Sequence, residues 1–319
     1  MLSSSDFNKK QIVFVFLNRG EKLCFSNDNF VIKTSDGKIK FQCTCYRLFI
    51  VFAIGHGSIT SGLIQKAKKH RFSIVMVTQS LRPYQIINAM MEGNTLLRKA
   101  QYSYDSIDLA KHITCNKITN QRGLLSGIRN KNQKQVEAID MLDTYISKIP
   151  MCSNLHELMG YEGSASRVYF ASFFDNVVWK GRAPRTKCDM INTLLDIGYS
   201  ILFSFIEILL GCYGFDTYCG VMHRNFYMRK SLVCDIIEPF RVLIDAQIKK
   251  SMNLKQFKEE DFLKKDNRFL LKWVKNPDYV SILAKPIVDN KMHIHAYIQQ
   301  YYRSFMKRKP MDEYPLFKY

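Results

Sequence analysis

Acidic residues are scarce in this sequence: 28 aspartates and glutamates accompany 47 lysines and arginines in 319 residues, a net charge of +19. An excess of this size favours binding to a polyanion, either a nucleic acid or an anionic membrane surface. No Asp-x-Asp pair occurs, which argues against nucleases that hold their metal ions with a dense acidic cluster. The acidic run Glu259-Glu260-Asp261 lies among lysines and is typical of a solvated face.

Paired cysteine motifs are also missing. Among nine irregularly spaced cysteines, only Cys43 and Cys45 are close, and one residue separates them instead of the two typical of a zinc knuckle. This usage predicts reduced thiols. The first residues, MLSSSDFNKKQIVF, lack the basic start and apolar centre of a secretory signal. We therefore expect a cytoplasmic protein.

Long apolar runs are rare, and residues 197–215 form the one stretch that resembles a membrane span. This run contains Glu207 and three glycines. An ionised glutamate at the centre of a bilayer costs about 2.5 to 3.5 kcal/mol. Basic residues are spread over several segments and do not form one basic amphipathic helix. We therefore predict a buried core helix and no membrane partner.

The periodicity of apolar residues predicts an α+β protein, with a small β-rich N-terminal domain (1–84) and a larger all-α domain (85–319). Strands separated by hairpin turns are expected early in the chain, together with one helix. The expected strands are 11–17, 38–44 and 72–77, and the expected helix follows Ser58 and extends through Lys69.

Helical spacing begins near residue 84. It predicts helices over 84–91, 108–112, 133–146 and 188–210, and on both sides of Asp235. Residues 117–134 are rich in lysine, arginine, asparagine and glutamine, which predicts a flexible connection that is either solvated or in contact with DNA. The aromatic and basic residues of the segment 301–319 suit either nucleic-acid contact or an ordinary helix end.

Four residues are candidates for a metal-dependent site: Glu162, His223, Asp235 and Glu238. Phosphodiester chemistry needs a divalent cation that polarises a phosphate oxygen and lowers the pKa of the attacking hydroxyl. Carboxylates suit Mg²⁺, and Mn²⁺ also accepts a histidine nitrogen. Taken singly, each residue more often has a structural role, so the prediction depends on the set.

The local sequence around these candidates suggests how they are presented. Gly160 and Gly163 flank Glu162, which predicts a helix start whose amides point toward an anion. Asp235 and Glu238 share a face if their helix is continuous. Pro239 disfavours helical geometry at Glu238, so a new helix could equally begin there. The spacing leaves open whether a metal takes Glu238, Asp235 or both.

These segments resemble those of the CRISPR-associated protein 1 family, the integrases of CRISPR adaptation. Residues 160–170 (GYEGSASRVYF) resemble a Gly-x-Glu-Gly segment, and residues 214–223 a glycine-rich stretch that ends in histidine. Residues 235–241 (DIIEPFR) resemble an Asp-x-x-Glu-Pro-Phe-Arg segment, and residues 187–200 the segment that joins the two halves of the site. Thr217 departs from the family pattern, which often has proline before the histidine.

The resemblance implies a β-stranded N-terminal domain for dimerisation and DNA contact, followed by a helical catalytic domain. It implies Glu162, His223 and Glu238 as ligands of Mg²⁺ or Mn²⁺, assisted by Asp235. A DNA 3′-hydroxyl would attack a repeat phosphodiester and insert a short foreign fragment; with water in its place, the same site acts as an endonuclease. The expected partners are double-stranded DNA, a second copy of the chain and the small ferredoxin-like CRISPR-associated protein 2.

Basic residues within or beside the motif segments are candidates for phosphate contacts. They are Arg167, Arg224, Arg229, Lys230 and Arg241. The alternative function is a non-catalytic nucleic-acid-binding scaffold.

Overall fold

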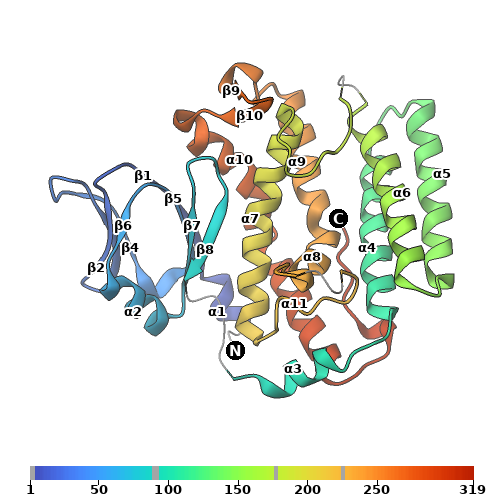
Figure 1. Cartoon of the computed structure of the whole chain (residues 1–319), viewed down its shortest axis with the longest axis horizontal. Helices are drawn as coiled ribbons and strands as arrows, with labels where there is room; N and C mark the ends of the chain where they lie inside the picture. Colours follow the sequence, from blue (N-terminus) through green and yellow to red (C-terminus); the bar gives the residue numbers. More distant parts are fainter. Residues whose placement is uncertain (1–3, 88–92, 176–178, 224–226) are drawn as a thin grey trace.

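The computed structural model describes residues 4–87, 93–175, 179–223 and 227–319. Within these ranges, the N-terminal region forms two four-stranded sheets with one helix packed against them (Figure 1). The elements of this region are α1 (Ser4–Asn8), β1 (Gln11–Leu17), β2 (Lys22–Ser26), β3 (Asn29–Lys33), β4 (Ile39–Thr44), β5 (Leu48–Gly55), β6 (Ser58–Ile59), α2 (Ser61–His70), β7 (Ser73–Val77) and β8 (Pro83–Ile87).

The first sheet has the order β1-β5-β7-β8 and is the one that meets the helices. β5 lies between two parallel neighbours, β1 and β7. Its sequence, LFIVFAIG, is apolar and buried over its first seven residues, as expected of a strand covered on both faces. The second sheet, β4-β3-β2-β6, contains the predicted hairpins, because β2 pairs with β3 and β3 with β4 in antiparallel register.

Two details of this region differ from the sequence prediction. The helix begins at Ser61, with Thr60 as its N-cap, because Ser58 and Ile59 pair with β2. The helix predicted over 84–91 is wrong for residues 84–87, which the structure describes. Residues up to Ile87 form β8 and pair with β7, so sheet pairing outweighs the helical spacing of this segment; residues 88–91 lie outside the described ranges.

The remainder of the chain is mostly helical (Figure 1). Its elements are α3 (Thr95–Tyr102), α4 (Asp108–Ser126), α5 (Gln133–Lys148), α6 (Leu155–Phe173), α7 (Met190–Tyr213), α8 (Ser231–Ile236), α9 (Arg241–Asn253), β9 (Phe262–Lys265), β10 (Arg268–Leu271), α10 (Asn276–Asp289) and α11 (Lys291–Met306). The α+β class is confirmed. The expectation of an all-α region is wrong in detail, since β9 and β10 form an antiparallel hairpin.

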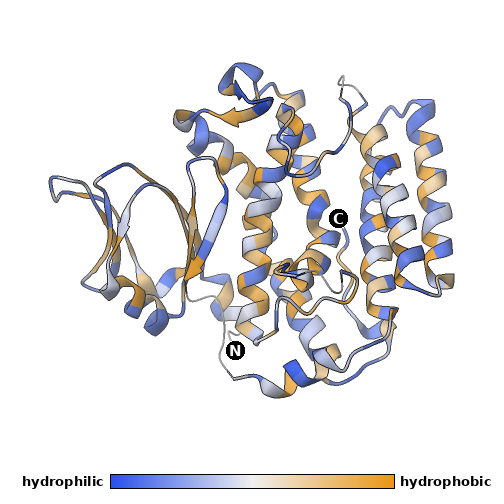
Figure 2. Cartoon of the chain, viewed as in Figure 1, coloured by the Kyte–Doolittle hydropathy of each residue, from blue (hydrophilic) through white to orange (hydrophobic). Residues whose placement is uncertain are grey.

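α7 stands at the centre of the molecule, between the first sheet and the remaining helices (Figure 1). It is long and apolar enough to cross a membrane by composition, but 83% of its most apolar window is buried inside the protein. Figure 2 shows apolar colour along much of this helix. Glu207 within it is buried and pairs with Lys230. The predicted buried core helix is therefore confirmed.

The basic connection predicted over 117–134 is wrong for its first ten residues. Residues 117–126 continue α4, and the described connection to α5 begins only at Gly127. Side chains of this half of α4 are buried against α5, α6 and α9, which stabilises helix where composition alone favoured a loop. The segment 301–319 begins as the end of α11 and then returns along α4.

The boundary at residue 84 stays a prediction. Phe49 and Phe52 of β5 belong to the same apolar cluster as the helices, and the ring of Phe49 lies 6.3 Å from that of Phe205 on α7.

Candidate active site

Glu162 lies in the middle of α6, so the helix start predicted at Gly160 and Gly163 is wrong. The helix begins at Leu155, seven residues earlier, because Asn154 caps it by accepting a hydrogen bond from the amide of Glu157. A Cβ added to Gly160 or Gly163 would meet nothing within 4 Å. The glycines therefore lie within the helix, face open space at their own positions and do not form an anion-binding helix end.

Asp235 and Glu238 are separated by a change of helix. α8 ends at Ile236, a 3-10 turn covers Glu238–Phe240, and α9 starts at Arg241. Pro239 lies in the first positions of this turn, where a proline is favoured, so a new helical segment does begin here. The expectation that proline keeps Glu238 out of helical geometry is wrong, because Glu238 is itself part of the turn. As a result the two carboxylates reach different partners, the loop that carries His223 for Asp235 and helix α4 for Glu238.

Glu162 and Glu238 meet at the ammonium group of Lys117, which extends from α4. Its Nζ pairs with Glu162 Oε1 and lies 2.6 Å from Glu238 Oε2. Ser166, one turn after Glu162, donates a hydrogen bond of 3.0 Å to the same Glu162 oxygen. The side chains of Lys117 and Glu238 are 6% and 7% exposed, and that of Glu162 is 21% exposed. Glu162 is therefore the solvent-facing member of the group.

Burial and charge act in opposite directions on this group. Burial lowers the pKa of Lys117, but the carboxylates of Glu238 and Glu162 outweigh it and raise the pKa above its usual value. Burial raises the pKa of Glu238, but Arg241, Lys117 and, to a smaller extent, His223 bring it to about 2. Glu238 is thus a carboxylate and Lys117 an ammonium at neutral pH.

Lys117 was missed as a site residue because it stood within the predicted loop. One signal for it exists in the sequence. Thr114, Lys117 and Gln121 are polar at helical spacing, and all three are buried on the inner face of α4. A polar stripe of this kind within an otherwise apolar contact surface indicates a buried polar network.

His223 is oriented by Asp235. Oδ1 of Asp235 lies 2.6 Å from Nδ1 of the imidazole and also accepts a hydrogen bond from the His223 amide. Oδ2 accepts hydrogen bonds from the amides of Val221 and Met222. Because a carboxylate only accepts, Nδ1 carries the proton, so Nε2 is the ring nitrogen left to present a lone pair.

Gly220 allows the His223 loop to lie against α8. A Cβ at this position would come within 2.7 Å of Asp235 Oδ2 and 2.8 Å of the Ser231 carbonyl carbon. The glycine-rich stretch before His223 therefore has a steric role, namely to bring the loop amides to the Asp235 carboxylate.

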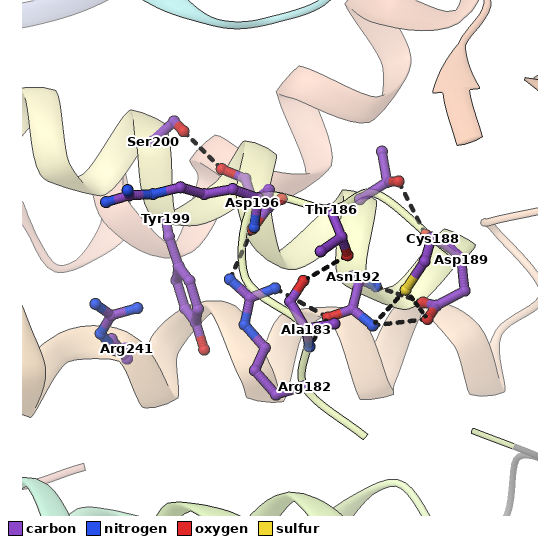
Figure 3. Close-up of polar contacts among 12 residues, drawn as sticks. Arg182, Ala183, Thr186, Cys188, Asp189, Asn192, Asp196, Tyr199, Ser200 and Arg241 are labelled. Atoms are coloured by element: carbon purple, nitrogen blue, oxygen red, sulfur yellow. Dashed lines mark hydrogen bonds and ion pairs between the residues drawn. The ribbon is translucent and has the colours of Figure 1, made fainter. Parts of the chain in front are cut away.

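Arg241 contacts both Glu238 and a residue of α7, Tyr199. Its guanidinium lies 3.1 Å from Glu238 Oε1 and 4.5 Å from the centre of the Tyr199 ring. Arg182 lies 5.5 Å from the same ring, so Tyr199 stands between two guanidinium groups (Figure 3). Arg182 also pairs with Asp196 at 2.7 Å.

The chain before α7 is held to this helix by Asn192. Its side-chain oxygen accepts hydrogen bonds from Arg182 and from the Ala183 amide, and its amide group donates to the Gly181 carbonyl (Figure 3). Asp189 caps α7 by accepting a hydrogen bond from the Asn192 amide. The segment 187–200 thus contacts Arg241, the partner of Glu238, through Tyr199, and it contacts residues 181–183 through Asn192.

The predicted phosphate contacts fall into different environments. Arg167 is exposed on α6, next to Ser166. Arg229 donates to the Cys234 sulfur and Lys230 pairs with Glu207, so both are tied to neighbouring elements. Arg241 is tied to Glu238, and Arg224 lies outside the described residues.

The donor types suit a divalent cation, although no ready-made group of three metal-binding side chains is found within the described ranges. The group that converges is made of two carboxylates and an ammonium, because Lys117 contacts a carboxylate oxygen of both Glu162 and Glu238. Two carboxylates that converge on one cation, and a histidine whose Nδ1 is held by a third carboxylate, are the donor types that Mn²⁺ or Mg²⁺ takes in proteins.

Comparison with known proteins places the chain in a family. The family model described as "CRISPR associated protein Cas1" matches residues 14–303. The chain is 28% identical over 263 residues to CRISPR-associated endonuclease Cas1 1 of Thermodesulfovibrio yellowstonii, covering 78% of this chain and 83% of the relative.

Two solved structures share the fold. A chain of a Cas6-RT-Cas1–Cas2 complex matches 97% of this chain with a TM-score of 0.82 at 21% identity, and the match spans 36% of that longer chain. A casposase bound to integration product matches 94% of this chain, and 91% of its own length, with a TM-score of 0.77 at 18% identity. Together with the match of the family model over most of the sequence, these likenesses establish that the chain belongs to the CRISPR associated protein Cas1 family.

Proposed function

We propose that this protein is a metal-dependent DNA integrase and endonuclease of CRISPR adaptation, which inserts short foreign DNA fragments into a CRISPR array. The relative from Thermodesulfovibrio yellowstonii is named an endonuclease, and the casposase of similar fold is bound to an integration product. Membership of the Cas1 family and the net charge of +19 support the same activity.

One observation carries the catalytic part of the proposal. Glu162 from α6 and Glu238 from the turn before α9 converge on one buried cation, the ammonium group of Lys117. These residues are far apart in the sequence. At the point where they converge the Glu162 side chain is 21% exposed, which gives a phosphodiester access to it from solvent.

Glu162, Glu238 and the Nε2 of His223 would hold Mg²⁺ or Mn²⁺. When bound, the ion supplies positive charge for the phosphate and lowers the pKa of the attacking 3′-hydroxyl or water. Asp235 keeps the His223 ring in one tautomer and orientation. Arg241 and Ser166 hold the carboxylates in place.

DNA and protein partners follow from the same proposal. Arg167, exposed next to the site, is the best placed of the predicted phosphate contacts. Arg224, Arg229 and Lys230 are also proposed as phosphate contacts, whereas Arg241 is proposed to act through Glu238. Assembly as a homodimer with Cas2 is proposed because a Cas1–Cas2 complex shares the fold. The cytoplasmic location stays a prediction.

The test is strand transfer of a short duplex with 3′-hydroxyl ends into a supercoiled plasmid that carries a CRISPR repeat, with Mn²⁺ or Mg²⁺ and with Cas2 supplied. The informative variants are Glu162→Gln and His223→Ala. Matched controls are Glu157→Gln on the same helix and His156→Ala, both exposed. We expect joined products with the wild type and the controls, and loss of products in both site variants and with EDTA.

The alternative is a nucleic-acid-binding scaffold without catalysis, which the lack of a three-donor group within the described ranges favours. Wild-type protein that binds DNA but neither joins nor cuts it, with Cas2 and either ion present, would support the scaffold and overturn the catalytic proposal. Joining that persists in Glu162→Gln and His223→Ala would show that the reaction occurs at another site.

A further inference from the structure

We propose that Lys117 is a resident counter-ion of the active site: its ammonium group occupies the position between Glu162 and Glu238 when no metal is bound, and a divalent cation has to displace it. The inference rests on the proposed function, because it takes these two carboxylates as metal ligands. It assigns to α4 a residue that regulates metal binding, in addition to the ligands contributed by α6 and the turn before α9.

The contacts of Lys117 carry this inference. Its ammonium pairs with one oxygen of Glu162 and one of Glu238, which come from separate elements. The lysine side chain is 6% exposed, so the ion pairs are formed largely out of water, where screening is weak. Within the described ranges, Lys117 and Arg241 are the charged groups that form ion pairs with Glu238.

The charges of this group balance without a metal ion. The two carboxylates carry two negative charges, and Lys117 and Arg241 carry two positive charges. A divalent cation that binds the same carboxylates would leave the group with excess positive charge in a buried environment. Because like charges at close range repel strongly there, the ammonium has to leave its position for the metal to bind.

The backbone near Lys117 is held in place, so the displacement must be a motion of the side chain. Asn116 donates a hydrogen bond to the Phe317 carbonyl at 2.7 Å, and Asn120 donates one to the Pro239 carbonyl at 3.0 Å. These bonds tie α4 to the C-terminal segment at the residue before Lys117 and to the Glu238 turn three residues after it. The long and flexible lysine stem can reorient while α4 keeps its position.

The experiment measures Mn²⁺ binding by isothermal titration calorimetry, without DNA, at fixed pH and salt. Full-length wild type is compared with Lys117→Met, which keeps an unbranched apolar stem but has no charge. Lys111→Met, on the same helix and contacting the Pro150 carbonyl, is the matched control. Glu162→Gln tests whether the ion binds at this site, and circular dichroism checks that each variant is folded.

We expect Lys117→Met to bind Mn²⁺ at least about tenfold more tightly than the wild type, since no buried ion pairs have to be broken. Lys111→Met should bind as the wild type does. Equal or weaker binding by folded Lys117→Met would overturn the inference while leaving the metal site intact. If Lys117→Met does not fold without metal, the same comparison is made with Lys117→Arg, whose larger charged group should weaken Mn²⁺ binding under this inference; unchanged binding there contradicts it.

Failure of the proposed function has a different signature. Wild-type protein that shows no saturable Mn²⁺ binding, or Glu162→Gln that binds as the wild type does, would remove the metal site itself. In either case the role of Lys117 as a competitor of the metal would also be rejected.

Discussion

His223 and Asp235 are joined by a contact of 2.6 Å between Nδ1 and Oδ1, and Asp235 also accepts hydrogen bonds from three consecutive backbone amides of the histidine loop. The carboxylate is fully buried. With its two oxygens engaged by four donors, Asp235 is suited to position His223, which leaves Glu238 as the carboxylate that shares a cation with Glu162.

Asp235→Asn should lower strand-transfer activity by on the order of 10- to 100-fold, because an amide group cannot accept from all four donors and no longer fixes the tautomer of His223. The variant should also unfold at a lower temperature. Strand-transfer rates and thermal denaturation measure the two effects. Asp140→Asn, exposed on α5, is the control and should change neither. Wild-type activity in Asp235→Asn would contradict the positioning role.

Gly220→Ala should destabilise the protein by about 1 to 3 kcal/mol and reduce activity. The added Cβ would meet Asp235 Oδ2 at 2.7 Å and the Ser231 backbone at 2.8 Å, so the histidine loop has to move away from α8. Urea denaturation measures the change. Gly62→Ala on α2 meets nothing within 4 Å and should be neutral or stabilising, as alanine favours helix. Equal effects of the two variants would argue against the steric reason.

Phe317→Ala should destabilise the protein by about 3 to 5 kcal/mol, since this ring is buried and lies 4.7 Å from Phe240 in the Glu238 turn. Its backbone exchanges hydrogen bonds with Asn116 on α4. Leu316→Ala, at a residue that is 55% exposed, should change stability by less than about 0.5 kcal/mol. The free energy of unfolding of both variants is measured by urea denaturation. Similar losses of stability in the two would contradict the packing role of the Phe317 ring.

Asp245 should make stability depend on pH. Burial raises its pKa to about 6, and hydrogen bonds from Tyr199 and Tyr169 only partly offset this. A pKa raised on folding means that the folded state takes up the proton more readily, so stability rises as pH falls through about 6 toward the unfolded value near 3.8. Wild type should gain about 2 kcal/mol relative to Asp245→Asn between about pH 8 and pH 4.5.

The difference in unfolding free energy between wild type and Asp245→Asn, measured by urea denaturation across this pH range, isolates the contribution of Asp245 because the other titrating groups are common to both proteins. A difference that does not change with pH would show that the pKa of Asp245 is not raised on folding.

Three features follow from the amino-acid sequence alone: the α+β class, the buried helix around Glu207 and the resemblance of the site segments to one family. Each depends on residues that are close together in the chain. Apolar periodicity reports which face of an element is buried, and the spacing within segments such as residues 235–241 is a property of the chain alone. The start of a new helical segment at Pro239, one of the two expected alternatives, also follows from the sequence, since proline is favoured in the first turn of a helix.

Only the tertiary structure decided how the site is completed. Lys117 is separated by 45 residues from Glu162 and lies in a segment whose composition favoured a loop. Burial of its helix against other helices overrides that composition. Likewise, Asp235 and Glu238 are close in sequence, yet the change of helix between them directs one carboxylate to His223 and the other to Lys117. The partners of these side chains are set by packing between segments that are far apart in the chain. A local pattern of residues does not encode this packing.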